Sequence, residues 1–320
     1  MHKSKLASVR SMFWTAIVAG LLIGGFGVAP NAASAAFKVG AKKCEECHRA
    51  EAKVWKGTKH FKSYKGIHKD KRAKKIVKAI GDKRMKKSET CAICHYTAAQ
   101  KGPSAKQKRV SGPSCESCHG AASDWIALHN DYGKGVKRDD EPAAHKAERI
   151  KKAEAAGMVR PDRLFDVAAN CMDCHGLANP ALDAKDAAAM LDNEHPLNPD
   201  FEFIQYSQGS VRHRFYPPDV TVNKEMPDAA KSHMYVIGQA AALVSATNAM
   251  SKSDHAKFKA AQEKRIATAK AVLETVKGQV PEVAKLLAEP TAANGRALAE
   301  AIKGKDLTGA VGGKLPKKFK

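Results

Sequence analysis

The sequence has few aromatic residues and no cysteine outside four short motifs. Phe, Trp and Tyr make up 6% of the 320 residues, which is low for an apolar core of this size. All eight cysteines lie in the motifs, so none remains for a structural disulfide. After Val28 no apolar run has the length of a membrane span, and no nucleophile motif, phosphate loop or carboxylate pair stands out. We therefore expect a soluble mature protein whose core takes apolar bulk from another source.

Each of the four motifs has the pattern Cys-x-x-Cys-His: CEECH (44–48), CAICH (91–95), CESCH (115–119) and CMDCH (171–175). The pattern is typical of covalent c-type haem, where the thiols add to haem vinyl groups and the histidine binds the iron. A structural zinc site pairs two Cys-x-x-Cys knuckles and does not require a histidine after each one. The sequence therefore predicts four covalent haem c groups, whose porphyrins supply the missing apolar bulk. They would be attached through Cys44, Cys47, Cys91, Cys94, Cys115, Cys118, Cys171 and Cys174, with proximal ligands His48, His95, His119 and His175.

The N-terminus has the pattern of an export signal. Lys3, Lys5 and Arg10 precede an apolar stretch over residues 12–28, and Ala33-Ser34-Ala35 follows it. This order predicts a signal peptide over residues 1–35, cleaved after Ala35, and therefore a periplasmic protein. The apolar stretch is just long enough to span a bilayer, so an uncleaved anchor is the alternative.

The chain is strongly basic, with a formal net charge of +22. Haem propionates would neutralise only part of this charge, and the remaining cationic surface would attract acidic partners. An exported protein is not expected to bind nucleic acid, whereas a basic surface would allow peripheral association with a membrane. Lysine-rich faces that only keep the protein hydrated are the alternative interpretation.

The periodicity favours a mainly α fold with little sheet. Segments 49–80 and 143–156 are rich in Ala, Lys and Glu and predict helices, residues 201–206 allow a short strand at best, and residues 100–114 predict an exposed basic loop. After residue 222 no cysteine occurs, and helices are predicted over 229–250, 255–280 and two shorter segments before a basic tail. We therefore expect a haem-packed core over 36–222 and a helical C-terminal extension over 223–320, which acts as a cover or as a docking element.

The histidines outside the motifs provide candidates for the second axial ligand of each iron. If a helix runs from His48 to His60, it rises about 18 Å over 12 residues, so His60 cannot bind the iron held by His48 but can reach another. The same argument applies to His129, which lies about 15 Å along a helix from His119. The alternative is that both are surface residues. His68, His145 and His255 lie in lysine-rich stretches and are expected to be solvated.

The motif order and spacing over residues 40–215 resembles the tetrahaem cytochrome c-554 family of the hydroxylamine oxidation pathway. The resemblance lies in "KKCEECHRAEAKVWKGTKH", "CAICHYTAAQKG", "GPSCESCHG" and "CMDCH". It implies that three haems have two histidines and that one, the haem of His95, is five-coordinate. It also implies that His129 pairs with His48, His60 with His119 and a late histidine with His175. The segment "FEFIQYSQGSVRHRF" points to His213 for this last position, with His195 and His233 as rivals.

These features predict an electron-transfer protein, because four haems in so short a segment must lie close together. Two histidine ligands favour low potentials. The partners would be a donor oxidoreductase and, as acceptor, another cytochrome or a membrane quinone enzyme; the resemblance makes hydroxylamine oxidoreductase one candidate donor. The alternative is an enzyme that reduces a small ligand such as nitric oxide at a five-coordinate haem.

Overall fold

The structure is a computed structural model in which residues 36–213 and 222–320 are described. These residues are mostly helical with one two-stranded sheet, so the predicted mainly α class is confirmed. The described residues form one compact unit. The predicted signal peptide, residues 1–35, lies outside the described residues. Among the helices that the structure describes, none is both long and apolar enough to cross a bilayer.

The elements follow the chain in three groups. The first group contains α1 (Ala41–Glu45), α2 (Arg49–Gly57), α3 (Lys59–Gly66), η1 (Ile67–Lys69), α4 (Lys71–Ala79), η2 (Met85–Lys87), α5 (Glu89–His95), β1 (Thr97–Ala99) and β2 (Lys108–Ser111). The second contains α6 (Cys115–His119), η3 (Arg138–Asp140), α7 (Ala143–Ala155), α8 (Leu164–His175), α9 (Ala184–Asp192) and α10 (Phe203–Ser207). The third contains α11 (Asp228–Ala249), α12 (Ala256–Val276), α13 (Glu282–Ala288), α14 (Ala292–Ala301), α15 (Thr308–Val311) and η4 (Gly312–Lys314).

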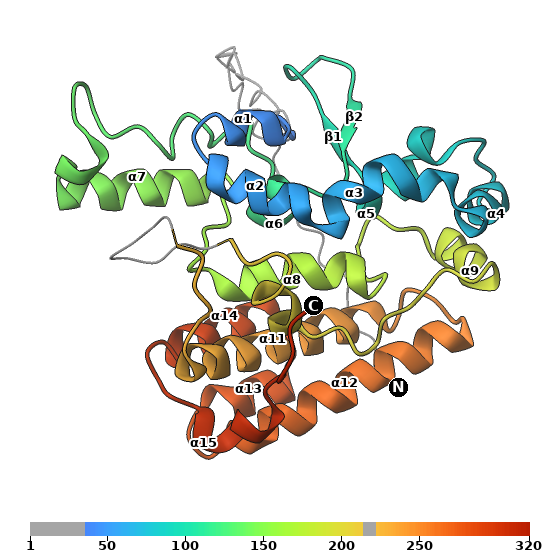
Figure 1. Cartoon of the computed structure of the whole chain (residues 1–320). Coiled ribbons are helices and arrows are strands. Elements are labelled where there is room, and N and C mark those ends of the chain that lie inside the picture. Colours follow the sequence, from blue (N-terminus) through green and yellow to red (C-terminus); the bar gives the residue numbers. More distant parts are fainter. Residues whose placement is uncertain (1–35, 214–221) are drawn as a thin grey trace, which may run out of the picture. The chain divides into compact units, whose positions relative to one another are not determined.

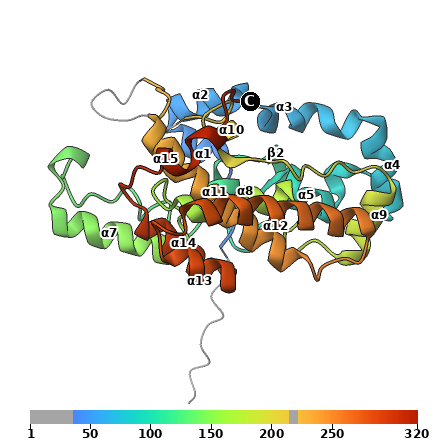
Figure 2. The ribbon, with the colours of Figure 1, turned by 90° about the horizontal axis from the view of Figure 1, so that it is seen from below.

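Helix α8 lies between the first group and the C-terminal helices (Figure 1). Viewed from below, α8, α11 and α12 run side by side, with α7 and α9 near opposite ends of them (Figure 2). Because α8 carries the fourth Cys-x-x-Cys-His motif, one helix connects the motif-bearing region with the C-terminal helices.

The largest apolar cluster of the described residues surrounds α8 and α11. Phe165, Ala168 and Met172 on α8 pack with α11, and the cluster continues through α12, α13 and α14. At Gly295 on α14, an added Cβ would lie 2.1 Å from Cε2 of Phe165, so this close approach of α14 to α8 requires glycine. The burial on α8 shows that the C-terminal helices cover the helix of the fourth motif.

The region around the first three motifs has only small apolar clusters. One joins Ala73 and Val77 of α4 to Cys91 and Tyr96, and another joins Ala122 and Trp125 to Ala153. Neither resembles the continuous cluster around α11. Around these motifs the side chains alone therefore do not form an extended core, in keeping with the low aromatic content of the chain.

The continuous helix expected from the first motif to His60 does not form. Helix α2 ends at Gly57, and Thr58 is extended, with φ −75° and ψ 161°. The Thr58 side chain accepts a hydrogen bond from the Phe61 amide and starts α3. The helix expected from His119 to His129 is also absent, because α6 ends at Gly120, which has φ +84°. The 18 Å and 15 Å estimates therefore do not apply.

Two smaller expectations are wrong. Residues 201–206 were expected to allow a strand, but Glu202 accepts hydrogen bonds from the amides of Ile204 and Gln205 and so starts α10. Residues 100–114 were expected to form a loop, but Lys108–Ser111 is strand β2, antiparallel to β1 with Thr97 opposite Ser111. The helices predicted over 143–156, 229–250 and 255–280 are confirmed as α7, α11 and α12.

We predict that Leu243→Ala lowers the free energy of unfolding by about 2–5 kcal/mol, because Leu243 is fully buried at the centre of the α11 cluster. Denaturant titration followed by circular dichroism measures the change. Val110→Ala is the control, since Val110 is 46% exposed and should change stability by less than about 0.5 kcal/mol. Equal effects of the two substitutions would contradict the assignment of the main core to the C-terminal helices.

Candidate haem-binding sites

Each Cys-x-x-Cys-His motif forms one candidate site, numbered here in chain order. Site 1 contains Cys44, Cys47 and His48, site 2 Cys91, Cys94 and His95, site 3 Cys115, Cys118 and His119, and site 4 Cys171, Cys174 and His175. In sites 2, 3 and 4 both cysteines lie on a helix, three residues apart and hence on one face, and the histidine ends that helix. In site 1 the chain turns after α1, and His48 precedes α2.

Local capping fixes where two of these helices start. The Ser88 hydroxyl accepts a hydrogen bond from the Cys91 amide at the start of α5. Ser114 and Ser117 form a capping box at the start of α6. The buried Glu116 of α6 accepts hydrogen bonds from the amides of Val39, Gly40 and Ala122. These bonds hold the segment before site 1 against site 3.

Thiols from different sites are neighbours and affect the pKa of one another. The pairs are Cys44 with Cys115, Cys118 with Cys171, and Cys94 with Cys174. The neighbouring thiol is the largest cause of a raised pKa at Cys44, Cys94 and Cys171. No disulfide joins any of the eight cysteines. The contacts connect the sites in the order 1, 3, 4, 2, which differs from their order in the chain.

Each motif histidine faces a histidine from outside the motifs. The ring centres are 6.4 Å apart for His48 and His129, 6.0 Å for His175 and His60, 6.1 Å for His95 and His195, and 6.2 Å for His119 and His213. A metal–imidazole bond is about 2 Å long and a ring nitrogen lies about 1 Å from its ring centre, so two imidazoles on opposite sides of one metal are roughly 6 Å apart. All four pairs fit an iron between them.

Hydrogen bonds at Nδ1 orient several of these rings. Nδ1 lies 2.8 Å from the Val159 carbonyl oxygen in His119, 2.7 Å from that of Ile126 in His129, and 3.0 Å from that of Pro196 in His195. A neutral ring that donates from Nδ1 to a carbonyl keeps the lone pair of Nε2 free for a metal. The arrangement therefore suits iron binding through Nε2.

Burial keeps most of the paired imidazoles neutral. It lowers the pKa of His95 and of His175 to about 4, and it also lowers the pKa of His60, His119 and His195. A metal binds the neutral ring, so these histidines need lose no proton at neutral pH before they coordinate.

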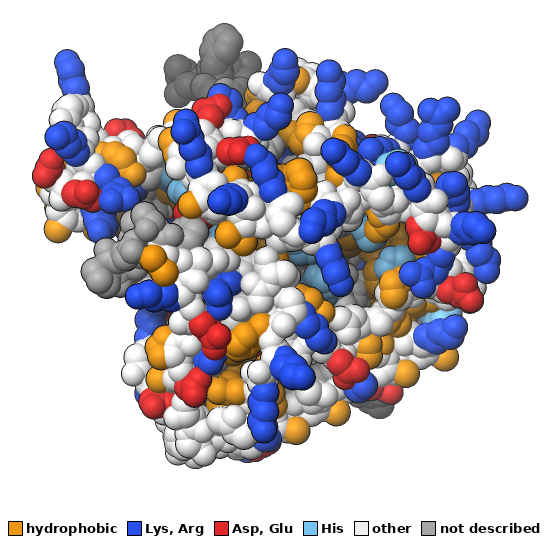
Figure 3. Space-filling view, in the orientation of Figure 1, with side chains coloured by type: hydrophobic (Ala, Val, Ile, Leu, Met, Phe, Trp, Pro, Cys, Tyr) orange, Lys and Arg blue, Asp and Glu red, His pale blue; other side chains and the backbone are white. Residues whose placement is uncertain are grey.

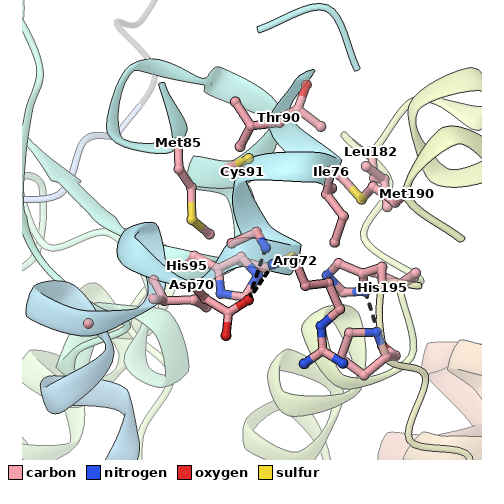
Figure 4. Close-up of a pocket in the computed structure, with 17 residues that line it drawn as sticks. Asp70, Arg72, Ile76, Met85, Thr90, Cys91, His95, Leu182, Met190 and His195 are labelled. Carbon is pink, nitrogen blue, oxygen red and sulfur yellow. Dashed lines mark hydrogen bonds between the residues drawn. The ribbon is translucent and has the colours of Figure 1, made fainter. Parts of the chain in front are cut away.

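Cavities with apolar walls lie between the paired histidines. One of about 290 Å³ is lined by Cys91, Cys94, His95 and His195, with Ile76, Val77, Met85, Leu182 and Met190 as its apolar wall (Figure 4). A second of about 700 Å³ is lined by residues of sites 2, 3 and 4 together with His60, His195 and His213. Their chemistry fits the group that the motifs indicate: thiols for covalent attachment, paired imidazoles for the iron and apolar walls for the porphyrin.

A buried cation lies beside site 4. Arg265 on α12 is 5% exposed and donates hydrogen bonds to the Gln262 side-chain oxygen and the Ser245 hydroxyl. An added Cβ at Gly176, directly after His175, would lie 2.0 Å from Nη1 of Arg265. Burial lowers the pKa of Arg265 to about 10, so the guanidinium remains charged at neutral pH.

Comparisons with known proteins agree with these features. The family model described as cytochrome c554 and c-prime matches residues 43–120, which contain sites 1, 2 and 3. Cytochrome c-554 of Nitrosomonas europaea is 29% identical over 150 residues, which cover 45% of this chain and 59% of that protein. The resemblance to the cytochrome c-554 family is confirmed. No solved structure gave a match. Similarity to this family implies covalently bound haem c, although the match covers less than two thirds of the curated relative.

The histidine pairs differ from those that the cytochrome c-554 resemblance implied. His129 faces His48, as expected. His60 faces His175 instead of His119, and His213 faces His119 instead of His175. The two expected partners are therefore exchanged. The break at Thr58 gives α3 its own start, and His60 lies in the first turn of that helix.

The structure also places a histidine opposite His95, where the resemblance implied an open position. His195 lies in the loop after α9, following Glu194 with φ +66°, and its amide donates to the Met190 carbonyl. Helical spacing could not predict this pairing, because the two residues are 100 positions apart and His195 lies on no helix. In the sequence, His195 stood out only as an alternative to His213 for the position opposite His175.

The remaining histidines lie in other environments. His145 bonds to Glu141, and His255 caps α12 and bonds to Asp192. His255 is therefore less solvated than expected. His233, the other rival, lies on α11, where burial lowers its pKa. Within the described residues none of the three shares a ring contact with a motif histidine.

We predict that His195→Ala converts one haem from low to high spin while all covalent haem is retained, because the thioether bonds and His95 remain. Electron paramagnetic resonance and the absorption spectrum of the oxidised protein measure the change. His145→Ala is the control and should leave the spectrum unchanged, since Glu141 is its partner. A high-spin haem in the wild-type protein that is unaffected by His195→Ala would contradict the pairing with His95.

Proposed function

We propose that the protein is a periplasmic tetrahaem c-type cytochrome that transfers electrons between an oxidoreductase and another cytochrome or a quinone-linked membrane enzyme. The observation that carries the proposal is a second histidine about 6 Å from each motif histidine. The sites also lie next to one another in the order 1, 3, 4, 2, because α1 packs on α6, α6 packs on α8, and sites 4 and 2 line one cavity. Haem supplies a one-electron redox centre, and closely spaced centres allow transfer from one to the next. The predicted export signal at residues 1–35 supports the periplasmic location.

The residues of each site have separate roles in this proposal. The cysteine thiols of sites 1 to 4 hold the haems covalently, and the motif histidines bind the irons on one side. His129, His195, His213 and His60 bind on the other side in sites 1, 2, 3 and 4 respectively. The apolar walls, such as Ile76 and Val77 at site 2, exclude water. Two strong axial ligands leave an iron little need to reorganise when its charge changes, and they favour a low potential.

The alternative function, reduction of a small ligand such as nitric oxide, needs an iron with an open position. His195 lies opposite His95 at the same separation as the other pairs. The geometry therefore favours the electron carrier over the enzyme.

We also propose that residues 223–320 cover site 4 and tune its haem. Helix α11 packs on the apolar side of α8, and α12 brings Arg265 to Gly176. The hydrogen bond from the Gln262 side chain to the Gly176 carbonyl, 2.9 Å long, ties α12 to the residue after His175. The extension is thus proposed to act on a site that lies outside the residues matched by the family model.

We predict that the purified mature protein begins at Ala36 and contains four covalent haems. Intact-mass spectrometry measures both, and the paired variant Cys171→Ala and Cys174→Ala should lose one haem. A mass that corresponds to zinc, or to fewer than four haems after expression with a haem-attachment system, would contradict the proposal.

We predict that Arg265→Met lowers the midpoint potential of the site 4 haem, because a nearby buried positive charge favours the reduced iron. A tenfold change in the equilibrium for reduction corresponds to about 59 mV for one electron, and we expect a change of this order. A redox titration followed by absorbance measures it. Arg265→Lys retains the charge and should retain most of the potential. If both variants change the potential equally, the effect of Arg265 comes from packing and the electrostatic argument fails.

A further inference from the structure

One segment contains most of the excess positive charge of the chain. Residues 53–87 contain fifteen lysines and arginines but only two acidic residues, Asp70 and Asp82. Their formal charge is +13, out of +22 for the whole chain. The segment comprises most of α2, then α3, η1, α4 and η2. The net charge of the protein is therefore concentrated on a few short helices.

These cations are exposed and largely unpaired. All of them except Lys86 are exposed, and among the described residues the ion pair that involves this segment is that of Lys56 with Glu45. Asp70 instead accepts hydrogen bonds from the amides of Arg72 and Ala73 at the start of α4. Figure 3 shows the Lys and Arg side chains gathered over α3 and α4, beside a hollow where histidine side chains are visible. We call the exposed lysines and arginines of residues 59–87 the basic face.

The basic face lies directly over site 2. Ala73, Ile76 and Val77 on the buried side of α4 line the cavity that contains His95, whereas Lys74 and Lys78 on the same helix are exposed. Cys94 of site 2 and Cys174 of site 4 line the same cavity, so site 2 follows site 4 and is one end of the series of sites. A protein that binds the basic face would therefore lie next to a terminal site of the series.

The other end of the series has a different surface. Around site 1 two of the lysines have acidic partners: Lys43 pairs with Glu46, and Lys56 with Glu45. The side chain of His48 is 53% exposed and its Nδ1 lies 3.6 Å from Glu51. The two ends are thus electrostatically distinct, so one acidic partner would select site 2.

The surface chemistry favours a protein over a membrane. A helix that inserts into a lipid surface needs an exposed apolar side, but the apolar side of α4 is buried against the cavity. Among the described residues, the large apolar side chains that are exposed are Val110 and Val222, both outside the segment. Electrostatic attraction without insertion is typical of transient redox complexes that form quickly and dissociate quickly.

We propose that the basic face is the docking surface for an acidic redox protein and that electrons are exchanged there through site 2. The proposal rests on the electron-carrier function and adds where one partner binds and what charge it carries. Complementary charge raises the association rate, and salt screens this effect.

The test uses the complete haem-loaded protein and reduced flavodoxin, an acidic one-electron donor, in stopped-flow experiments at several ionic strengths. The basic-face variant carries Lys71→Glu, Lys74→Glu, Lys75→Glu and Lys78→Glu, all at exposed positions of α4. The matched control carries Lys257→Glu, Lys270→Glu, Lys277→Glu and Lys285→Glu, which are exposed on α12, α13 and the turn between them and give the same net charge. A small neutral reductant reports whether the haems of each variant remain functional.

We expect the basic-face variant to lose at least about tenfold in the rate constant for reduction by flavodoxin at low salt, and the control variant to lose much less. Carbodiimide cross-linking of the wild-type protein to flavodoxin should join lysines within residues 59–87. Equal losses in both variants, or cross-links mainly elsewhere, would overturn the docking surface while the carrier function stands. If the wild-type protein binds vesicles of anionic lipid through these lysines but its reaction with flavodoxin is unchanged in the basic-face variant, the partner is a lipid surface and the proposal is wrong. If the haems of the wild-type protein accept electrons neither from flavodoxin nor from the small neutral reductant, the electron-carrier function fails as well.

Discussion

The structure depends on four pairs of imidazoles whose ring centres lie about 6 Å apart. Burial alone would make such a pair costly, because a ring nitrogen in an apolar cavity needs a partner. Carbonyl oxygens lie within hydrogen-bond distance of Nδ1 in His119, His129 and His195, which leaves Nε2 of each ring available for a metal. An iron between the two rings of a pair would bind both. Folding of this region and haem binding are therefore expected to be strongly coupled.

The same requirement explains the uneven distribution of apolar packing. Around sites 1 to 3 the side chains form small clusters, and cavities lie at sites 2, 3 and 4. The extended cluster appears where α8 meets α11 and the helices that follow. Helix α8 has one side in this cluster and carries site 4 at its end, so a rigid helical layer fixes at least one of the four sites. The C-terminal helices thus contribute to site 4 without supplying a cysteine: α14 packs against Phe165 of α8, and α12 places Arg265 beside Gly176.

The elements predictable from the sequence were those with a local cause. In sites 2 to 4 the motif forms a turn of helix with two thiols on one face. The apolar positions of residues 255–280 likewise lead to α12, with Phe258 and Leu273 on its buried face. The pairing of histidines has no local cause. It depends on Thr58, whose side chain starts a new helix two residues before His60, and on Glu194, whose left-handed backbone precedes His195. A single capping bond or turn of this kind changes the direction of the chain, so helical geometry cannot be extrapolated across it to find which motif histidine the ligand faces.

The spatial order of the sites follows from the same non-local packing. Unequal gaps between the motifs allow site 3 to lie between sites 1 and 4, with Glu116 holding the segment before site 1 and the Cys118–Cys171 contact reaching site 4. Site 2, second in the chain, becomes the far end of the series because α5 approaches the end of α8 at Cys94 and Cys174. The segment between sites 1 and 2 contains α3, α4 and the basic face, whose lysines point away from the cavity that the buried side of α4 lines. The two ends of the series lie on different surface elements, so they can serve different partners. Lys43 and Lys56 near site 1 are ion-paired, whereas the lysines of the basic face over site 2 are not. Such a difference in surface charge is what allows one acidic partner to choose between the two ends.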